Sequence, residues 1–425
     1  MPRCGVMRCC RDVHRAVMSG WYGRRPCDVC VTDKEIPLHL HALFPSRRFF
    51  RLSLALPLVA GCALALAGCS EDDDSQEPPP PPAPAKALVV GHRGASALRP
   101  EHTLESYRKA VEDGADIIEP DLVSTKDGVL VARHENEISG TTNVSEVAKF
   151  ADRKATKTID GVQLTGWFTE DFTLAELKEL RARERIPQIR PANTQYNDQF
   201  EIPTLTEVIA LAKQLSEQTG RIIPIYPETK HPTYFQTIGL PLEDRLVTAL
   251  KADDYTASKA TVYIQSFEVA NLKALRARLG TSQSNWKLVQ LLEVETLRPY
   301  DFTVAGDTRT YADLMTEQGM KEIATYANGV GPYKRSIINV DSEGKFMAPT
   351  ALVRNAHAVN LTVHPYTFRP ENSFMPAPLK VAGPDSTRTP AGLIAELHAY
   401  LDAGIDGFFT DDPAVGRQAV DSYVP

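Results

Sequence analysis

Three acidic residues lie in strand-like segments at a spacing suited to binding a metal ion. Glu119 and Asp121 occupy positions i and i+2 of the stretch 115–125, which places both side chains on one face of a strand. Glu228 closes a second strand-like stretch. Carboxylates held close together repel unless a cation lies between them, and an all-oxygen group favours Ca²⁺ or Mg²⁺. Zinc is a weaker expectation, because no cysteine follows Cys69.

Two histidines and an arginine follow the same kind of segment. His92 and Arg93 stand in Gly-His-Arg-Gly at the end of the first apolar run, and His134 stands in Ala-Arg-His-Glu at the end of another. Histidine titrates near neutral pH, so two histidines beside a divalent ion are suited to general acid and general base catalysis. The planar fork of Arg93 matches an anionic oxygen, phosphate above all. A lone histidine is more often structural, so the prediction depends on the whole group.

The segments that must position these residues alternate between strand-like and helical patterns. Eight β-then-α units can be counted, and their strands begin near residues 87, 115, 221, 261, 286, 328, 360 and 406. Helical spacing is clear in stretches such as 103–114, 268–280 and 391–404. This order predicts an α/β protein with a (β/α)₈ TIM barrel, whose active site lies where the strands end. A doubly wound open sheet is the alternative architecture.

The second unit departs from the simple alternation. Lys126-Asp127-Gly128 predicts a tight turn into a further strand over 129–135, which forms a β-hairpin. Residues 136–203 are then loop-like and polar, with one expected helix over 173–184. We interpret 136–203 as an insertion that lies over the strand ends.

Charge and cysteine content divide the chain near Cys69. Residues 1–69 carry ten Lys and Arg against four Asp and Glu, whereas the remainder has a net charge of -13. A body this acidic is a poor nucleic-acid binder, because neutralising the phosphate backbone requires clustered Lys and Arg. All seven cysteines lie at or before Cys69, so the body can form no disulfide framework of its own.

The first 86 residues are expected to be targeting sequence and spacer. A basic start at 47–51 precedes a short apolar run and Leu66-Ala67-Gly68-Cys69, which resembles a bacterial lipobox with Cys69 as the lipidated residue. Cys62 fits the same pattern, and a plain cleaved signal or an uncleaved anchor are further alternatives. The signal predicts a periplasm-facing lipoprotein of the bacterial cell envelope, held to the membrane by a lipid anchor, or else a soluble periplasmic protein.

These features divide the chain into three parts. Residues 1–69 form an N-terminal extension and signal, in which 1–46 are best explained by a start codon placed too far upstream. Residues 70–86 form an acidic, proline-rich linker. Residues 87–425 are expected to form the barrel domain, which includes the insertion at 136–203.

The body resembles the glycerophosphodiester phosphodiesterases, most closely the bacterial periplasmic members. The match covers about Leu88 to Asp412, beginning with the continuous stretch from Gly91 to Glu135 and including IYPETK, VYIQSF, LVQLLE, GVGP, VHPYTFR and GFFTDDP. The resemblance implies a TIM barrel with a divalent ion. It also implies hydrolysis of glycerophosphodiesters such as glycerophosphocholine to sn-glycerol 3-phosphate and an alcohol. Periplasmic members often use Ca²⁺, which favours Ca²⁺ over Mg²⁺ here.

The resemblance also assigns roles to single residues. It makes His92 and His134 the catalytic pair, Arg93 a phosphate contact, and Glu119, Asp121 and Glu228 the metal ligands. It makes Lys230 a second cation near the phosphate and Glu101 a supporting residue. Gln265, His364 and Tyr366 end later strands, where they either line the pocket or pack inside the barrel. The segments 294–327 and 371–390 carry no functional signal, which leaves the preferred alcohol open.

Two other functions fit the same residues. One is a related barrel phospholipase that acts on intact lipids, which a lipid anchor would suit. The other is a non-catalytic lipoprotein that binds glycerophosphodiesters. That second alternative predicts the loss of a histidine or a metal ligand, and the sequence retains all of them.

Overall fold

The strands that begin each unit form a closed parallel barrel in the computed structural model, which describes residues 86–280 and 284–425. Eight strand positions follow one another around it: β1 (Leu88–His92), β2 (Ile117–Glu119) continued by β3 (Asp121–Ser124), β7 (Glu228–Thr229), β8 (Val262–Ser266), β9 (Trp286–Leu292), β10 (Gly329–Pro332), β11 (Thr362–Val363) and β12 (Gly407–Thr410). Neighbouring positions pair in parallel, in the order β12-β1-β2 and β3-β7-β8-β9-β10-β11.

Two junctions close the ring. Only Pro120 separates β2 from β3, so these two short strands are one strand position interrupted by a residue that cannot donate a ladder hydrogen bond. On the other side, the backbone N–H of Asp406 donates to the carbonyl of Val363 at 3.0 Å, and that of Phe409 donates to Pro365 at 3.0 Å. These bonds join β11 to β12. The expected (β/α)₈ barrel is therefore confirmed, and the open sheet is not observed.

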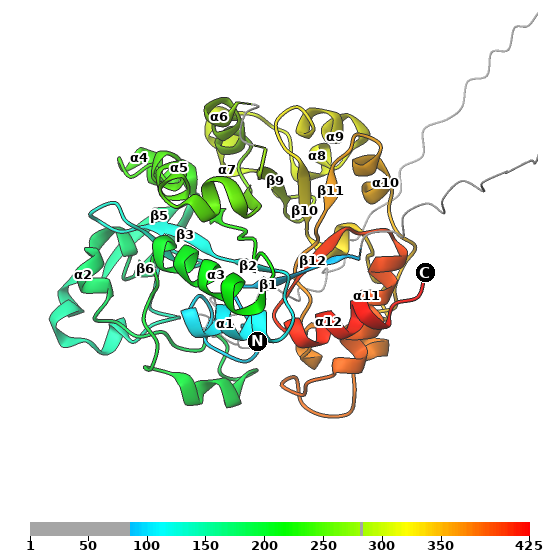
Figure 1. The fold of residues 1–425 in the computed structure, drawn as a ribbon, viewed down its shortest axis with the longest axis horizontal. Helices are drawn as coiled ribbons and strands as arrows, with labels where there is room; N and C mark the ends of the chain where they lie inside the picture. Colours follow the sequence, from blue (N-terminus) through cyan, green and yellow to red (C-terminus); the bar gives the residue numbers. More distant parts are fainter. Residues whose placement is uncertain (1–85, 281–283) are drawn as a thin grey trace, which may run out of the picture. The chain divides into compact units, whose positions relative to one another are not determined.

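Helices lie around the strands in Figure 1 and complete the β-then-α units. The longer ones are α1 (Leu104–Glu112), α3 (Leu205–Thr219), α5 (Glu243–Ala252), α6 (Val269–Leu279), α11 (Pro390–Asp402) and α12 (Pro413–Ser422). The shorter ones are α4 (Pro232–Thr237), α7 (Tyr300–Ala305), α8 (Tyr311–Leu314), α9 (Glu317–Ile323) and α10 (Leu352–His357). The expected helices over 103–114, 268–280 and 391–404 correspond to α1, α6 and α11.

The apolar core has two layers. A large cluster packs between the strands and the helices, and a smaller one fills the inside of the barrel with Val90, Ile117, Tyr226, Val289 and Phe409. Interior side chains such as these make a barrel a packed core and leave the strand ends free for chemistry.

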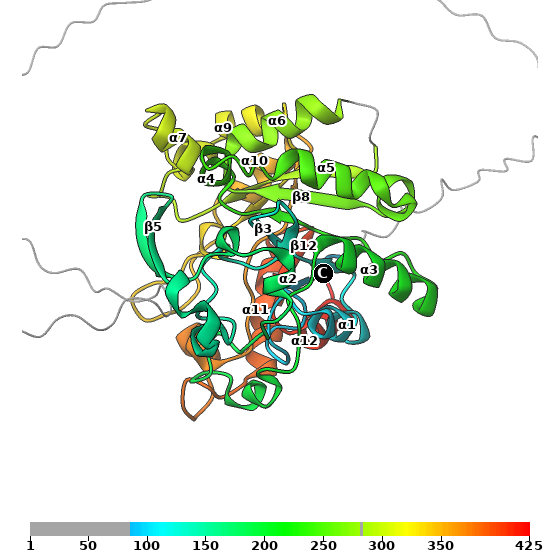
Figure 2. The same cartoon turned by 90° about the vertical axis from the view of Figure 1, so that its left-hand side faces the viewer.

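The second unit contains the expected hairpin and insertion. Strand β4 (Leu130–Ala132) pairs antiparallel with β3, and Gly128 in the turn has a φ of 81°, which suits glycine. The insertion holds a second hairpin, β5 (Ala155–Ile159) and β6 (Val162–Gly166), which extends to one side of the molecule in Figure 2.

The prediction of a helix over 173–184 is wrong in its length, because the observed helix is much shorter. Helix α2 covers only Leu174–Leu177, with Thr173 and Glu176 forming a capping box at its start. Beyond it, the backbone N–H of Arg181 donates to the side chain of Asn143, and that of Ala182 donates to the carbonyl of Phe200. Tertiary hydrogen bonds therefore replace helical ones and turn the following residues toward the barrel.

The predicted signal, both candidate lipidation residues, Cys62 and Cys69, and the acidic linker as far as Ala85 lie outside the described residues. Among the residues that are described, no helix is both long and apolar enough to cross a membrane.

Candidate active site

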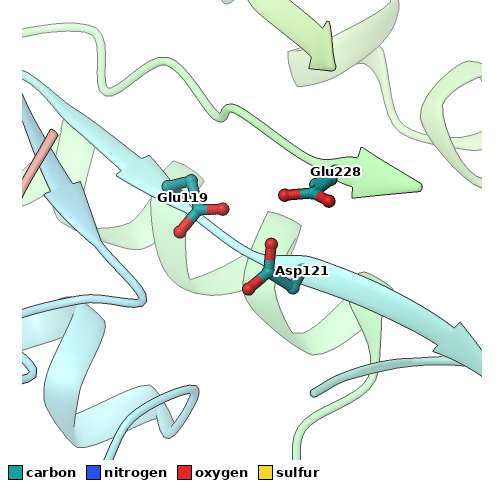
Figure 3. Close-up of side chains that lie close together, drawn as sticks. All are labelled: Glu119, Asp121 and Glu228. Carbon is teal, nitrogen blue, oxygen red and sulfur yellow. The ribbon is translucent and has the colours of Figure 1, made fainter. Parts of the chain in front are cut away.

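Strand register brings the three predicted ligands together. Asp121 is paired with Glu228 across β3 and β7, and Glu119 lies two residues before Asp121 on the same face. All three side chains are buried, and one carboxylate oxygen from each lies within 4.8 Å of the others. Figure 3 shows the three carboxylates turned toward a common point.

The carboxylate group fits a hard divalent cation. Burial, and then the charge of Asp121, raise the pKa of Glu119 well above its usual range, and burial raises the pKa of Glu228 to about 8 despite the adjacent Lys230. Asp121 is opposite: Lys230 and His102 overcome the effect of burial and hold its pKa well below the usual range. Asp121 Oδ1 is buried without a hydrogen-bond partner among the described residues. A cation would satisfy that oxygen and displace the protons that burial and the neighbouring carboxylates otherwise favour.

A sharp turn after β1 positions His92 and Arg93. Arg93 has a φ of 59° and Gly94 a φ of 90°, and a side chain at Gly94 would collide with Ser106 of helix α1. The backbone N–H of Arg93 donates to Glu119 Oε2 at 2.7 Å. The Arg93 guanidinium lies 3.2 Å from Glu101 and 3.6 Å from Asp121. The turn therefore ties Arg93 to the carboxylate group.

Asp411 fixes the His92 ring. His92 is paired with Glu119 across β1 and β2, and its Nδ1 lies 2.6 Å from Asp411 Oδ1, just beyond β12. Burial, then the neighbouring Arg93, lowers the pKa of His92 to about 4, so the ring is neutral at neutral pH. Because an ionised carboxylate can only accept, Nδ1 carries the proton and Nε2 keeps its lone pair.

His134 is held in a similar way by its neighbour in sequence. Its Nδ1 is hydrogen-bonded to the Glu135 carboxylate, and its Nε2 lies 3.3 Å from Lys230 Nζ. Burial, then Arg93, lowers its pKa to about 3. Lys230 Nζ also lies 2.7 Å from Glu228, so it links His134 to the carboxylate group. His92 is therefore the strand neighbour of Glu119, whereas His134 is connected to Glu228 through Lys230.

Of the remaining predicted site residues, Gln265 contacts the carboxylate group, whereas Tyr366 and His364 pack against the cluster inside the barrel. Gln265 is paired with Glu228, and its Nε2 donates to Glu119 at 3.1 Å. Tyr366 donates its hydroxyl to the carbonyl of Leu292 at 3.1 Å. His364 is fully buried in the barrel and hydrogen-bonded to the Tyr226 hydroxyl at 3.0 Å, so barrel packing accounts for its position.

Several residues of the site were missed in the sequence. Asp411 directly follows the last strand, and that position could have drawn attention to it. His102, which binds Asp121 at 2.9 Å, and Glu135 each adjoin a predicted residue. Arg185 and Arg190 lie in the insertion, and no spacing or periodicity in that segment marks them.

Comparison with known proteins identifies the family of the chain. The model of the Glycerophosphoryl diester phosphodiesterase family matches residues 92–415. A glycerophosphodiester phosphodiesterase of Arabidopsis thaliana is 36% identical over 335 residues, which cover 76% of this chain and 82% of the relative. One of Haemophilus influenzae is 31% identical over 385 residues, 86% of this chain and 97% of the relative.

Solved structures support the same fold. A candidate glycerophosphoryl diester phosphodiesterase of Silicibacter pomeroyi has a TM-score of 0.53 and 21% identity, covering 80% of this chain and 94% of its own. An Oleispira antarctica phosphodiesterase, solved with its product sn-glycerol-3-phosphate, has a TM-score of 0.50 and 19% identity, with 79% and 98% covered. The chain is therefore a phosphoric diester hydrolase that belongs to the glycerophosphoryl diester phosphodiesterase family.

Proposed function

We propose that the enzyme hydrolyses glycerophosphodiesters to sn-glycerol 3-phosphate and an alcohol, with His92 and His134 as its acid–base pair. The observation that carries this proposal is the placement of two tautomer-fixed imidazoles around one carboxylate group, with His92 paired to Glu119 in the sheet and His134 connected to Glu228 through Lys230. Splitting a phosphodiester requires one proton to be taken from the attacking hydroxyl and one to be given to the departing alkoxide. Two imidazoles on different sides of a bound phosphate are suited to these two transfers.

Arg93 is proposed to hold the phosphate. Its guanidinium is buried and stands between Glu101 and Asp121, yet its Nε has no hydrogen-bond partner among the described residues. An anionic oxygen would satisfy that donor, and the guanidinium fork suits phosphate geometry. Lys230 would supply a second positive charge.

Glu119, Asp121 and Glu228 would hold a divalent cation, with Ca²⁺ preferred over Mg²⁺. Three carboxylates supply hard oxygen ligands, and Ca²⁺ accepts an irregular set of such ligands more readily than Mg²⁺ does. A cation bound there would neutralise charge on the non-bridging phosphate oxygens. Because the cation does not supply the proton for the leaving alkoxide, that step is left to a histidine.

The activity is tested with the purified protein and glycerophosphocholine, with enzymatic detection of glycerol 3-phosphate as the readout. We expect turnover that stops in excess chelator and returns when Ca²⁺ is added. An intact phospholipid, offered in parallel, should react far more slowly. If the intact lipid is preferred, the proposed substrate class is wrong; if activity is unchanged in excess chelator, the proposed metal requirement is wrong.

We also propose that the enzyme is anchored to the membrane of the cell envelope through lipidated Cys69. The support is the sequence alone: an apolar run, a lipobox-like exit and a proline-rich spacer. Changing Cys69 to Ala should move the protein from the membrane fraction to the soluble fraction. Changing Cys62 to Ala is the matched control and should leave it in the membrane fraction; the reverse result would make Cys62 the lipidated residue.

A further inference from the structure

Arg190 of the insertion contacts the carboxylate that holds His92. Its Nη2 donates to Asp411 Oδ2 at 2.6 Å, while Asp411 Oδ1 lies 2.6 Å from His92 Nδ1. Arg369 Nε donates to the same Oδ2 at 2.8 Å, so Arg190 shares Asp411 with a second arginine. The Arg190 side chain is only 7% exposed, and its Nε donates to Glu371 at 2.7 Å. Burying a guanidinium this deeply requires paired acceptors, and Arg190 has them on two sides.

Arg185 makes the corresponding contact on the other side of the site. It donates to Glu135 at 2.6 and 3.0 Å, and Glu135 holds His134. It also donates to Glu101 at 2.6 and 2.7 Å, and Glu101 in turn binds Arg93. The Arg185 guanidinium is therefore connected to His134 through Glu135. Through Glu101 it is also connected to Arg93, the proposed phosphate contact.

A short turn of the insertion joins the two arginines. The carbonyl of Ile186 accepts from the backbone N–H groups of both Ile189 and Arg190, at 2.9 Å each. Arg190 Nη1 donates to the carbonyl of Ser96 at 3.0 Å, and the Ser96 hydroxyl donates to the carbonyl of His92. This turn is thus attached to the loop that follows β1.

The effect on the histidines follows from charge. A carboxylate that contacts an arginine stays ionised, so it accepts the Nδ1 proton and leaves Nε2 with its lone pair. The same negative charge stabilises the imidazolium that forms when Nε2 takes a proton. Arg185 and Arg190 also restrict the carboxylates to orientations that face the rings.

We propose that Arg185 and Arg190 are positioning residues that set the tautomer and orientation of His134 and His92. This inference rests on the proposed acid–base roles of the two histidines. If so, the insertion contributes to catalysis. Arg185 and Arg190 act through the carboxylates that contact the histidines and do not contact the reacting atoms themselves.

The test compares Arg190→Gln and Arg185→Gln with Arg183→Gln. Arg183 lies in the same segment but pairs with the surface residues Glu146 and Asp198, so its variant loses the same charge away from the site. Arg190→Gln should lower kcat for glycerophosphocholine about 10- to 100-fold, the usual range for groups that orient a reacting side chain, with little change in KM. Arg185→Gln should lower kcat and also raise KM, because Arg93 loses support. Arg183→Gln should behave like the parent.

Two further measurements separate positioning from simple loss of structure. The ¹⁵N chemical shifts of the imidazole rings should show a single Nδ1–H tautomer for His92 in the parent and a mixture in the Arg190→Gln/Arg369→Gln double variant, in which Asp411 has lost both of its arginine contacts. Arg190→Lys, which keeps the charge but not the fork, should recover only part of the lost kcat. If that variant matches the parent, or if both glutamine variants match Arg183→Gln, the inference is overturned. An inactive parent would instead contradict the proposed function.

Discussion

The barrel and its insertion both contribute side chains to the site, but different forces hold those side chains in place. Barrel residues are fixed by backbone ladders: Asp121 is paired with Glu228, and Glu228 with Gln265. Arg185 and Arg190 of the insertion are fixed by ion pairs with carboxylates. A ladder persists when a side chain is changed, whereas an ion pair is lost with the side chain. Substitutions in the barrel should therefore remove chemistry and keep the fold, and substitutions around the ion pairs should affect both.

The largest effect is expected from the carboxylate group of the barrel. Glu119→Gln should lower activity by at least about 10³-fold, since a divalent cation contributes several kcal/mol to the stabilisation of charge in such reactions. The thermal unfolding temperature without added metal should not fall, because burial and the charge of Asp121 favour the protonated, neutral form of Glu119, which Gln resembles in shape and charge.

The control for that change is Glu105→Gln, at an exposed position of helix α1. It should have the activity of the parent. Activity and unfolding are measured on the same preparations, with and without Ca²⁺. Substantial activity in Glu119→Gln would exclude Glu119 as an essential ligand.

The next largest effect concerns the two histidines. His92→Ala and His134→Ala should each lower kcat by about 10²-fold or more, because each proton transfer contributes about 10²- to 10⁴-fold. The double variant should lose much less than the product of the single losses, since the residues act as one unit. A nitrophenyl ester, whose leaving group needs no proton, should rescue the variant that lacks the general acid. Near-parent turnover by both single variants on glycerophosphocholine would refute the two-histidine mechanism.

These two regions also differ in how far sequence reasoning could reach. Glu119, Asp121 and Glu228 were predictable as a group because a strand has a fixed period of two residues and parallel strands end at one edge. The same reasoning placed His92 at that edge and His134 on the hairpin. His364 also follows a strand, yet it packs in the barrel with Tyr226. Tyr226 lies two residues before Glu228 on the same face, so this pair belongs to a deeper layer of the barrel than the carboxylates.

The insertion could not be predicted in the same way. Leu174 to Leu177 begins a well-capped helix, and the helical pattern continues beyond it, but bonds to Asn143 and Phe200 end the helix early. Those partners are distant in sequence, so no local pattern reveals them. The contacts of Arg185 and Arg190 depend on the path that follows, which explains why both were missed.

Smaller effects are expected from Asp411 and Glu135, the carboxylates that contact the two histidines, and the loss of unfolding free energy should differ between them. Asp411→Asn should lower kcat about 10- to 100-fold and the free energy of unfolding by about 3–5 kcal/mol, because it breaks buried ion pairs. Glu135→Gln should lower kcat similarly but the free energy of unfolding by only about 1 kcal/mol, since its side chain is 31% exposed. Activity and denaturant unfolding are both measured. Equal destabilisation would show that the insertion encloses Glu135 as completely as the barrel encloses Asp411.

The last effect concerns stability alone and is a change with pH that reports how deeply His92 is buried. Its pKa is lowered from 6.5 to about 4 by burial, so the folded protein resists protonation in a range where the unfolded chain binds a proton. The stability from this group is complete above pH 6.5 and is lost as the pH falls toward 4. His92→Gln removes this titration and with it the loss of stability. As the pH falls from 6.5 toward 4, the unfolding free energy of the variant should therefore rise relative to that of the parent, by up to about 1.4 kcal/mol per pH unit. Denaturant unfolding of both proteins between pH 7.5 and about 4.5 measures the difference. A difference that stays constant with pH would mean that His92 titrates normally, and that neither the barrel nor the insertion shields it from water.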